Sequence, residues 1–309
     1  MKILVTGASG MVGRNIVEQP YIKSNELLIP RSQELDLCDK QAVDQYVERH
    51  QPDCIIHSAG RVGGIQANIK EPYTFLQQNL MMGLNIVSSA YKYKIKKMVN
   101  LGSSCMYPKS LERPIRESDL LTAPLEPTNE GYALAKISVA KAVEYIVNED
   151  DSFRYTTLIP CNLYGKYDSF EPSKSHLIPA IIVKVINAAK TGEPVTVWGS
   201  GTVRREFMYA EDFANFVAYI LEKDIKMPTY LNVGLGYDYT IKEYYQSVAK
   251  VLGYQGDFEF DPSKPEGMKR KLVDIALLNK SGWKANTTLE QGILKTVDYY
   301  LSCPPTDEP

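Results

Sequence analysis

The sequence predicts an α/β protein with a doubly wound parallel (Rossmann) sheet and a smaller C-terminal α/β lobe. In the first half of the chain, short apolar runs alternate with longer amphipathic segments. This alternation is typical of a parallel sheet covered by helices on both faces. A glycine-rich turn also follows the first apolar run directly, as in units where a helix starts at the end of a strand.

The elements of the sheet domain are expected in alternating order. Apolar runs bounded by polar or turn residues predict strands at residues 3–6, 27–29, 53–57, 97–101 and 155–160. Apolar side chains at helical spacing predict helices at residues 11–19, 40–50, 72–93 and 129–147. Right-handed crossovers between parallel strands would then place these helices on both faces of the sheet.

The chain after residue 165 is organised differently. Polar, proline- and glycine-containing stretches predict loops at residues 165–175 and 261–270. Between and after them, helices are expected at 176–189, 210–222, 241–252 and 289–301, and strands at 195–197 and 230–233. We therefore predict a dinucleotide-type sheet domain at 1–165 and a lobe at 166–309. The two are expected to be interleaved, because a late strand can return to the sheet.

The composition limits the classes of function. The net charge is −2 and the pI about 6.0, which gives no reason to expect a nucleic-acid partner or an anionic membrane surface. The five cysteines are widely spaced without a CxxC pair, and the three histidines lack ligand spacing. We therefore expect no disulfide framework, no metal site and a cytoplasmic location.

Three glycines follow the first predicted strand with GxxGxxG spacing. Gly7 would permit the tight turn, Gly10 would let a pyrophosphate approach the backbone, and Gly13 would let the helix pack on the strand. A plain turn and helix start is the alternative. The predicted cofactor site also takes in three further residues of this loop, which are Ser9, Met11 and Val12.

Arg31 follows the second predicted strand, where the ribose of a dinucleotide would lie. A cation there can pair with a 2′-phosphate, whereas a carboxylate would bind a free 2′-hydroxyl. The sequence thus favours NADP(H) over NAD(H), with a solvated surface arginine as the alternative. Asp36 and Leu37 fit a contact with the adenine edge.

Tyr132 and Lys136 are four residues apart on one predicted helix, so they share a face. Ser103 follows the fourth predicted strand, at the sheet edge where ligands bind in such folds. A free tyrosine has a pKa of ~10, and a neighbouring ammonium is expected to lower it enough for proton transfer. An exposed helix face is the alternative reading of a YxxxK pattern on its own.

The glycine loop, Ser103, Tyr132 and Lys136 together resemble the extended short-chain dehydrogenase/reductases. Longer stretches resemble the GDP-L-fucose synthase family within them, over essentially the whole chain. These stretches are Val-Gly-Gly-Ile at 62–65, Gly-Ser-Ser-Cys-Met-Tyr-Pro-Lys at 102–109, Glu-Pro-Thr-Asn-Glu at 126–130, Asn-Leu-Tyr-Gly at 162–165, Ser-His-Leu-Ile-Pro-Ala at 175–180, Val-Trp-Gly-Ser-Gly-Thr at 197–202, Arg-Glu-Phe at 205–207 and Arg-Lys-Leu-Val-Asp at 270–274.

This resemblance implies an NADPH-dependent enzyme that epimerises a GDP-linked 4-keto-6-deoxymannose at C3 and C5 and then reduces C4. Cys105 and His176 match the family's proton-transfer pair, while Ser103 and Tyr132 would bind the C4 oxygen and Lys136 the nicotinamide ribose. The resemblance adds further cofactor contacts, which are Gly102, Pro160, Asn162, Leu163 and His176. It also implies GDP-sugar contacts in the lobe, which are Lys184, Trp198, Arg205 and Lys271. A homodimer through the helices at 72–93 and 129–147 follows from the same resemblance.

The chain departs from the family pattern at three positions. Ser9 replaces an arginine, Arg61 a lysine and Gly131 a proline next to the catalytic tyrosine. The sugar therefore stays open, and the alternative is a C4 reductase without epimerase activity that acts on a GDP-4-keto-heptose or another GDP-4-keto-6-deoxy sugar. A redox-neutral 4-epimerase or dehydratase and a non-catalytic dinucleotide sensor are the remaining hypotheses.

Overall fold

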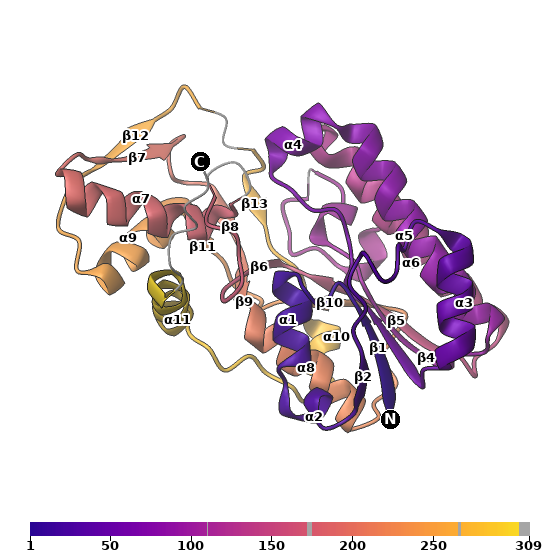
Figure 1. The fold of residues 1–309 in the computed structure, drawn as a ribbon. Coiled ribbons are helices and arrows are strands. Elements are labelled where there is room, and N and C mark those ends of the chain that lie inside the picture. Colours follow the sequence, from indigo (N-terminus) through magenta and orange to yellow (C-terminus); the bar gives the residue numbers. More distant parts are fainter. Residues whose placement is uncertain (110, 172–174, 265–266, 303–309) are drawn as a thin grey trace.

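The computed structural model describes residues 1–109, 111–171, 175–264 and 267–302. A layered sheet region and a smaller lobe make up the molecule, as Figure 1 shows. Cys303 and the end of the predicted lobe lie outside the described residues.

A six-stranded parallel sheet forms the larger region, with strand order β10-β5-β4-β3-β1-β2. Its strands are β1 (Lys2–Thr6), β2 (Glu26–Leu28), β3 (Cys54–His57), β4 (Lys97–Leu101), β5 (Arg154–Pro160) and β10 (Tyr230–Val233). The strand order reverses between β1 and β3, which creates a crevice at their carboxyl ends. The predicted doubly wound fold is confirmed, and β10 joins the sheet from the second half of the chain.

Helices cover both faces of this sheet because alternate strand residues point to opposite sides. Ile3 and Val5 of β1 join one core cluster, whereas Leu4 between them joins another. In Figure 1, α3 (Lys40–His50), α5 (Pro72–Lys92) and α6 (Glu130–Glu149) lie on one face. The other face carries α1 (Met11–Val17), α2 (Pro20–Lys23), α8 (Ala210–Glu222) and α10 (Ala276–Asn279).

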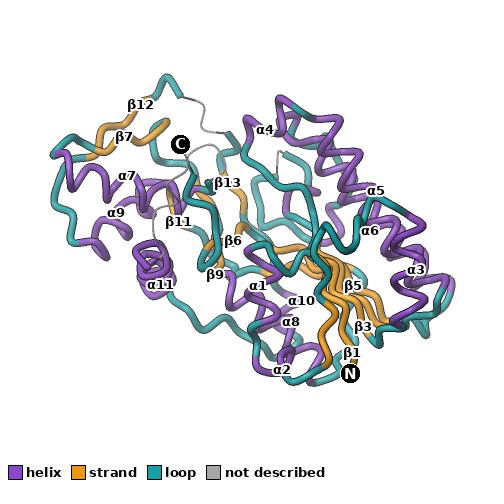
Figure 2. Tube along the Cα trace, viewed as in Figure 1, coloured by secondary structure: helices purple, strands orange, loops and turns teal. Residues whose placement is uncertain are grey.

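The lobe has its own apolar core, formed between its helices and short strands. The helices are α7 (Leu177–Thr191), α9 (Ile241–Leu252) and α11 (Leu289–Ser302), seen in Figure 2 beside the strands. The strands form small sheets of two or three: β7 (Val195–Trp198) with β12 (Phe258–Asp261), β6 (Asn162–Tyr164) with β9 (Phe207–Tyr209), and β8 (Arg204–Arg205) with β11 (Tyr239–Thr240) and β13 (Arg270–Lys271).

Several of these short elements were not predicted. The sequence analysis missed α2, α4 (Ile65–Lys70), α10 and the strands β6, β8, β9, β11, β12 and β13. The missed strands have only two to four residues, and a run this short is predicted from the sequence only where it is compactly apolar, as in β10. The predicted helix at 11–19 was also too long, because α1 ends at Val17 before Pro20 begins α2.

The contact between α5 and α6 depends on a glycine. A Cβ atom added at Gly83 would lie 2.4 Å from Cγ2 of Val139 on α6. We expect Gly83→Ala to lower the free energy of unfolding by about 1–3 kcal/mol, since the extra methyl overpacks the interface. Chemical denaturation would measure this loss. The double variant with Val139→Ala should lose less than the sum of the two single variants, and strict additivity would contradict the packing argument.

Candidate active site

The glycine loop lies at the crevice between β1 and β3, and two of its glycines are required by the fold itself. Gly7 has a φ of +73°, and a Cβ there would lie 2.6 Å from the Ala59 nitrogen. A Cβ at Gly13 would lie 2.1 Å from the Gly7 carbonyl oxygen. At Gly10, by contrast, the nearest described atom would be at an ordinary 3.5 Å. The open space above Gly10 fits the predicted approach of a pyrophosphate, and Ser9 beside it is exposed.

The segment after β2 presents the residues predicted for the adenosine end of a dinucleotide. Arg31 is exposed, and its backbone nitrogen donates to Glu34 Oε2 at 2.7 Å. No described residue pairs with the Arg31 guanidinium, so the group remains available for an anion. The Asp36 carboxylate accepts a hydrogen bond from the Cys38 nitrogen at 2.8 Å and is exposed beside Leu37.

Replacing Arg31 by alanine tests whether this guanidinium recognises a 2′-phosphate. We expect the KM for NADPH to rise roughly tenfold or more, since a hydrogen bond to a charged group contributes about 1.5–3 kcal/mol. The KM for NADH should change little. Arg49→Ala is a matched control, because Arg49 is exposed near the end of α3, at the opposite edge of the sheet. Equal effects on both cofactors would contradict the assignment.

Ser103, Tyr132 and Lys136 come together at the carboxyl end of β4. Ser103 caps the short 3₁₀ helix η1 (Ser104–Met106), and its Oγ accepts from the Cys105 nitrogen at 3.2 Å. Lys136 is buried, donates from Nζ to the Leu101 carbonyl oxygen at 3.0 Å, and lies 5.9 Å from the Tyr132 ring centre. Tyr132 in turn shares a hydrogen bond with the Ser103 side chain.

The protonation of this group differs from the sequence-based expectation. Burial raises the pKa of Tyr132 above its ordinary value, and the hydrogen bond with Ser103 only partly opposes this. The expected lowering by Lys136 was wrong for this structure, because the buried ammonium is directed at the Leu101 carbonyl. Burial also lowers the pKa of Lys136 to about 8. Tyr132 is therefore a protonated phenol at neutral pH, ready to donate rather than accept a proton.

Cys105 lies beside Ser103 and is contacted by two nitrogen donors. Asn129, in the 3₁₀ helix η3 (Pro127–Asn129), donates from Nδ2 to the Cys105 sulfur at 3.2 Å. The Lys271 ammonium, from β13 of the lobe, lies 3.6 Å from the same sulfur. Sequence reasoning assigned Lys271 to GDP and gave Asn129 no role, although its motif was noted. The thiol thus lies where the lobe meets the sheet.

Several predicted cofactor residues lie at this same sheet edge. Gly102 donates its N–H to the Leu158 carbonyl at 2.8 Å, which joins the ends of β4 and β5. Pro160 ends β5, and Asn162 donates from Nδ2 to the Glu206 carbonyl at 2.8 Å. Leu163 is buried in the core between sheet and helices. Asn162 therefore supports the lobe through its side chain.

His176 lies immediately before α7, and its side chain is 46% exposed. Within the described part of the chain, the His176 ring hydrogen-bonds to Asp168 and not to Ser103, Tyr132 or Cys105. The structure therefore groups four of the five predicted catalytic residues, and His176 lies at the start of α7 in the lobe.

Two of the predicted GDP contacts are neighbours in the lobe. The Lys184 ammonium on α7 lies 5.5 Å from the Trp198 ring at the end of β7. Lys184 also donates to the Thr196 carbonyl at 3.0 Å, and its partial burial lowers its pKa. Trp198 is 57% exposed, so one face of a large indole is open beside a cation. This pairing suits a planar, anionic ligand such as a nucleotide.

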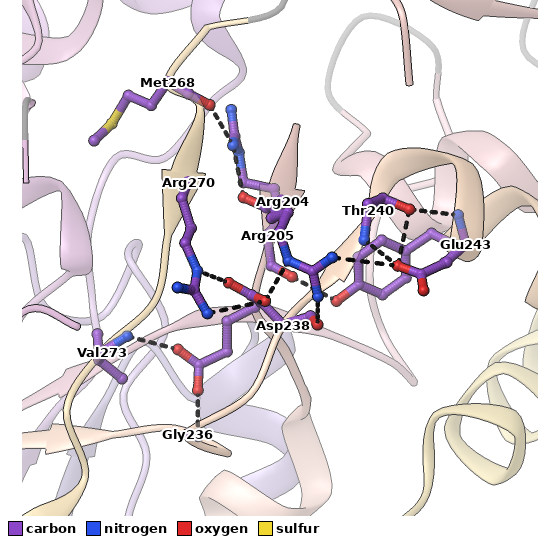
Figure 3. A network of polar contacts seen from close by, with 11 residues as sticks. Arg204, Arg205, Gly236, Asp238, Thr240, Glu243, Met268, Arg270 and Val273 are labelled. Carbon is purple, nitrogen blue, oxygen red and sulfur yellow. Dashed lines mark hydrogen bonds and ion pairs between the residues drawn. The ribbon is translucent and has the colours of Figure 1, made fainter. Parts of the chain in front are cut away.

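The other two, Arg205 and Lys271, lie side by side on paired strands. β8 and β13 run parallel with Arg205 opposite Lys271. Figure 3 shows the network that holds these strands, with Asp238 between Arg204 and Arg270 and with Arg205 directed at the Met268 carbonyl.

The buried Glu206 side chain adds further hydrogen bonds around these strands. Glu206 accepts N–H bonds from Leu235, Gly236 and Val273, at 2.5, 2.9 and 2.9 Å, and burial raises its pKa to about 7. Val273 follows Lys271 by two residues, so the hydrogen bond from its N–H to Glu206 holds the chain just after the strand whose Lys271 ammonium contacts the Cys105 sulfur.

The described ranges contain no cluster of three or more histidine, cysteine, aspartate or glutamate side chains arranged to hold a metal ion. Nor do they contain a helix with both the length and the apolar character needed to cross a bilayer.

Comparison with known proteins places these features in context. Residues 3–234 match the model of the NAD dependent epimerase/dehydratase family. The chain is 54% identical to a GDP-L-colitose synthase of Yersinia pseudotuberculosis, covering 98% of each chain. It is 47% identical to a GDP-L-fucose synthase of Azorhizobium caulinodans, covering 97% and 96%. Among solved structures, a GDP-mannoheptose C4 reductase from Campylobacter jejuni with NADP bound aligns with a TM-score of 0.86, 29% identity and coverage of 97% and 98%.

Proposed function

Because the chain belongs to the NAD dependent epimerase/dehydratase family and, within it, to the GDP-L-fucose synthase family, we propose that it is an NADPH-dependent C4 reductase of a GDP-linked 4-keto sugar that also epimerises C3 and C5. This membership confirms the resemblance found in the sequence. The observation that carries the proposal is the convergence of Ser103, Tyr132 and Lys136 with the Cys105 thiol at one sheet edge.

The residues divide the chemistry between them. NADPH, when bound, supplies the hydride to C4. The Tyr132 phenol donates a proton to the C4 oxygen, and the Ser103 hydroxyl hydrogen-bonds the same oxygen. Lys136 holds the nicotinamide ribose. The protons at C3 and C5 are acidic because each carbon is next to the C4 ketone, and Cys105 with His176 removes and returns them.

Binding residues lie on both sides of this group. The glycine loop (Gly7, Ser9, Gly10, Met11, Val12, Gly13), with Arg31, Asp36 and Leu37, would hold NADP(H), the cofactor that the family uses. Lys184, Trp198, Arg205 and Lys271 would hold the GDP-sugar. Because the Lys271 ammonium reaches the Cys105 sulfur, we place it at the sugar end of the substrate rather than at the guanine.

The identity of the sugar has two further candidates, each with its own observation. The 54% identical relative is named for GDP-L-colitose, whose sugar lacks the 3-hydroxyl group, so the 3-deoxy substrate is the second candidate. The Campylobacter structure is named a GDP-mannoheptose C4 reductase, so a GDP-4-keto-heptose that is reduced without epimerisation is the third candidate.

Gly131, which replaces the family's proline, lies in the contact between α5 and α6. A Cβ added there would lie 2.6 Å from the Pro72 carbonyl oxygen, so the replacement belongs to the packing of these two helices.

The deciding experiment is NADPH oxidation with GDP-4-keto-6-deoxymannose in heavy water, with proton NMR of the product. Deuterium at C3 and C5 of a fuco-configured product would support epimerisation followed by reduction. Reduction without the label would leave a C4 reductase and direct the next trial to GDP-4-keto-heptoses. Turnover of the 3-deoxy substrate alone, with deuterium at C5, would identify the colitose reaction. Absence of turnover with all three sugars would overturn the proposal.

We also propose a cytoplasmic homodimer that associates through α5 and α6. These helices expose large apolar side chains, namely Tyr73 (69%), Met81 (39%), Leu134 (40%) and Tyr145 (59%), which a second copy would cover. The cytoplasmic location is supported by free thiols, which are typical of proteins in reducing compartments. Among the described residues these are Cys38, Cys54, Cys105 and Cys161. Sedimentation equilibrium would test the dimer, and a monomer at micromolar concentration would overturn it.

A further inference from the structure

A buried carboxylate lies directly against the exposed imidazole of His176. The Asp168 side chain, between β6 and α7, is only 3% exposed, and its Oδ1 is 3.1 Å from His176 Nδ1. The backbone around Asp168 holds it in place. Its own N–H donates to the Gly165 carbonyl at 3.2 Å, and the Ser169 N–H donates to Oδ1 at 2.9 Å.

The second oxygen of this carboxylate has no partner. Asp168 Oδ2 is buried and accepts no hydrogen bond from any described residue. Burying a carboxylate costs several kcal/mol unless it is paired, so a carboxylate kept here with an unsatisfied oxygen is expected to serve a purpose. Among the described residues, His176 is its one side-chain partner.

The geometry determines which ring nitrogen of His176 is available. When Nδ1–H donates to Asp168, the other nitrogen, Nε2, is left for contacts outside the pair. The ring is 46% exposed, so without this bond little in the described structure would select one rotamer or tautomer.

We propose that Asp168 is a positioning residue that orients His176 for proton transfer to and from the sugar, with Nδ1 held by the carboxylate and Nε2 presented to the substrate. This inference rests on the proposed function, which makes His176 one of the two proton-transfer groups. When protonated Nε2 gives its proton to the substrate carbon, the neutral imidazole retains Nδ1–H on Asp168, and solvent restores the proton.

The charge of Asp168 also favours the form of His176 that can donate a proton. Its hydrogen bond and its charge raise the pKa of His176, whereas burial opposes the rise. The carboxylate thus favours the imidazolium, which is the form that can donate a proton near neutrality.

The first test is an NMR titration of the histidines in the unliganded protein. The chain has only three, His50, His57 and His176, so a His176→Asn variant assigns the signal. Asp168→Asn keeps the size of the side chain but removes its charge, and we expect the His176 titration midpoint to move to lower pH. Asp119→Asn is the matched control, because Asp119 is equally buried but pairs with Arg113. An unmoved midpoint in Asp168→Asn would overturn the inference.

The second test follows catalysis in heavy water. In Asp168→Asn, deuterium incorporation at C3 and C5 should fall about tenfold or more, because His176 loses its orientation and its protonated fraction. Reduction of a ketone supplied already epimerised should stay within a factor of about two or three. Equal loss of both activities, or unchanged incorporation, would overturn the positioning role.

Failure of the proposed function would be recognised separately. If the wild-type enzyme turned over no GDP-4-keto sugar, the proposed function would be wrong, and the catalytic role of His176 would be wrong with it. The NMR titration does not depend on substrate, so it still decides whether Asp168 holds the imidazole.

Discussion

Tyr132→Phe should reduce the rate of NADPH oxidation with the ketone substrate by about 10²–10⁴-fold, the usual contribution of a positioned general acid. In the proposed mechanism the hydroxyl is the proton source for the C4 oxygen, and burial keeps it protonated at neutral pH. Phenylalanine retains the ring that packs beside Lys136 but has no proton to give. Stopped-flow absorbance of NADPH under single-turnover conditions would measure the loss directly.

Tyr145→Phe provides the matched control for this substitution. Tyr145 lies on the same helix, α6, and is 59% exposed. It should reduce substrate at the wild-type rate. Both variants should bind NADPH with unchanged affinity, since the phenol is assigned to the ketone. Wild-type turnover in Tyr132→Phe would remove Tyr132 from the acid role.

Cys105→Ser should lower deuterium incorporation at C3 and C5 by roughly 10²-fold or more while sparing reduction of a ketone that is already epimerised. A serine hydroxyl does not ionise near neutral pH, so it cannot replace the thiol as a base. Its oxygen can still accept from Asn129 Nδ2 and Lys271 Nζ, which preserves the local contacts. Proton NMR of the product in heavy water separates the two activities.

Cys54→Ser is the control for replacing a cysteine elsewhere. Cys54 is buried at the start of β3, at the amino edge of the sheet and away from the site. It should leave both incorporation and reduction per folded molecule unchanged. If Cys105→Ser lost reduction as strongly as incorporation, the division between proton transfer and hydride transfer would be contradicted.

Local signals in the sequence identified most of the sheet domain. The bounds of α3, α8, α9, β4 and β10 match the prediction residue for residue. These elements have long periodic patterns or compact apolar runs, and each is read from neighbours along the chain. Gly7 and Gly13 were likewise assigned correctly, because a positive φ and a close backbone approach both demand glycine.

Contacts between residues far apart in the sequence could not be predicted. Lys271 pairs through β13 with Arg205 and also contacts the Cys105 sulfur, 166 residues earlier in the chain. No pattern in the sequence pointed to the contact between Asp168 and His176, because an aspartate eight residues before a histidine looks like any other polar residue of a loop. The short strands that bring them into place have no detectable period.

By itself, the sequence determined the doubly wound fold and the family, and it pointed to Tyr132, Cys105, His176 and Ser103 as the candidates for proton transfer and for binding the ketone. These follow from residue types at particular stations along the chain. Only the tertiary structure decided which groups surround each reactive atom: burial raises the pKa of Tyr132, Lys271 and Asn129 contact the Cys105 sulfur, and Asp168 holds His176. Proton affinity depends on burial and on charges within a few ångströms, and the folded chain brings those charges from segments far apart in the sequence.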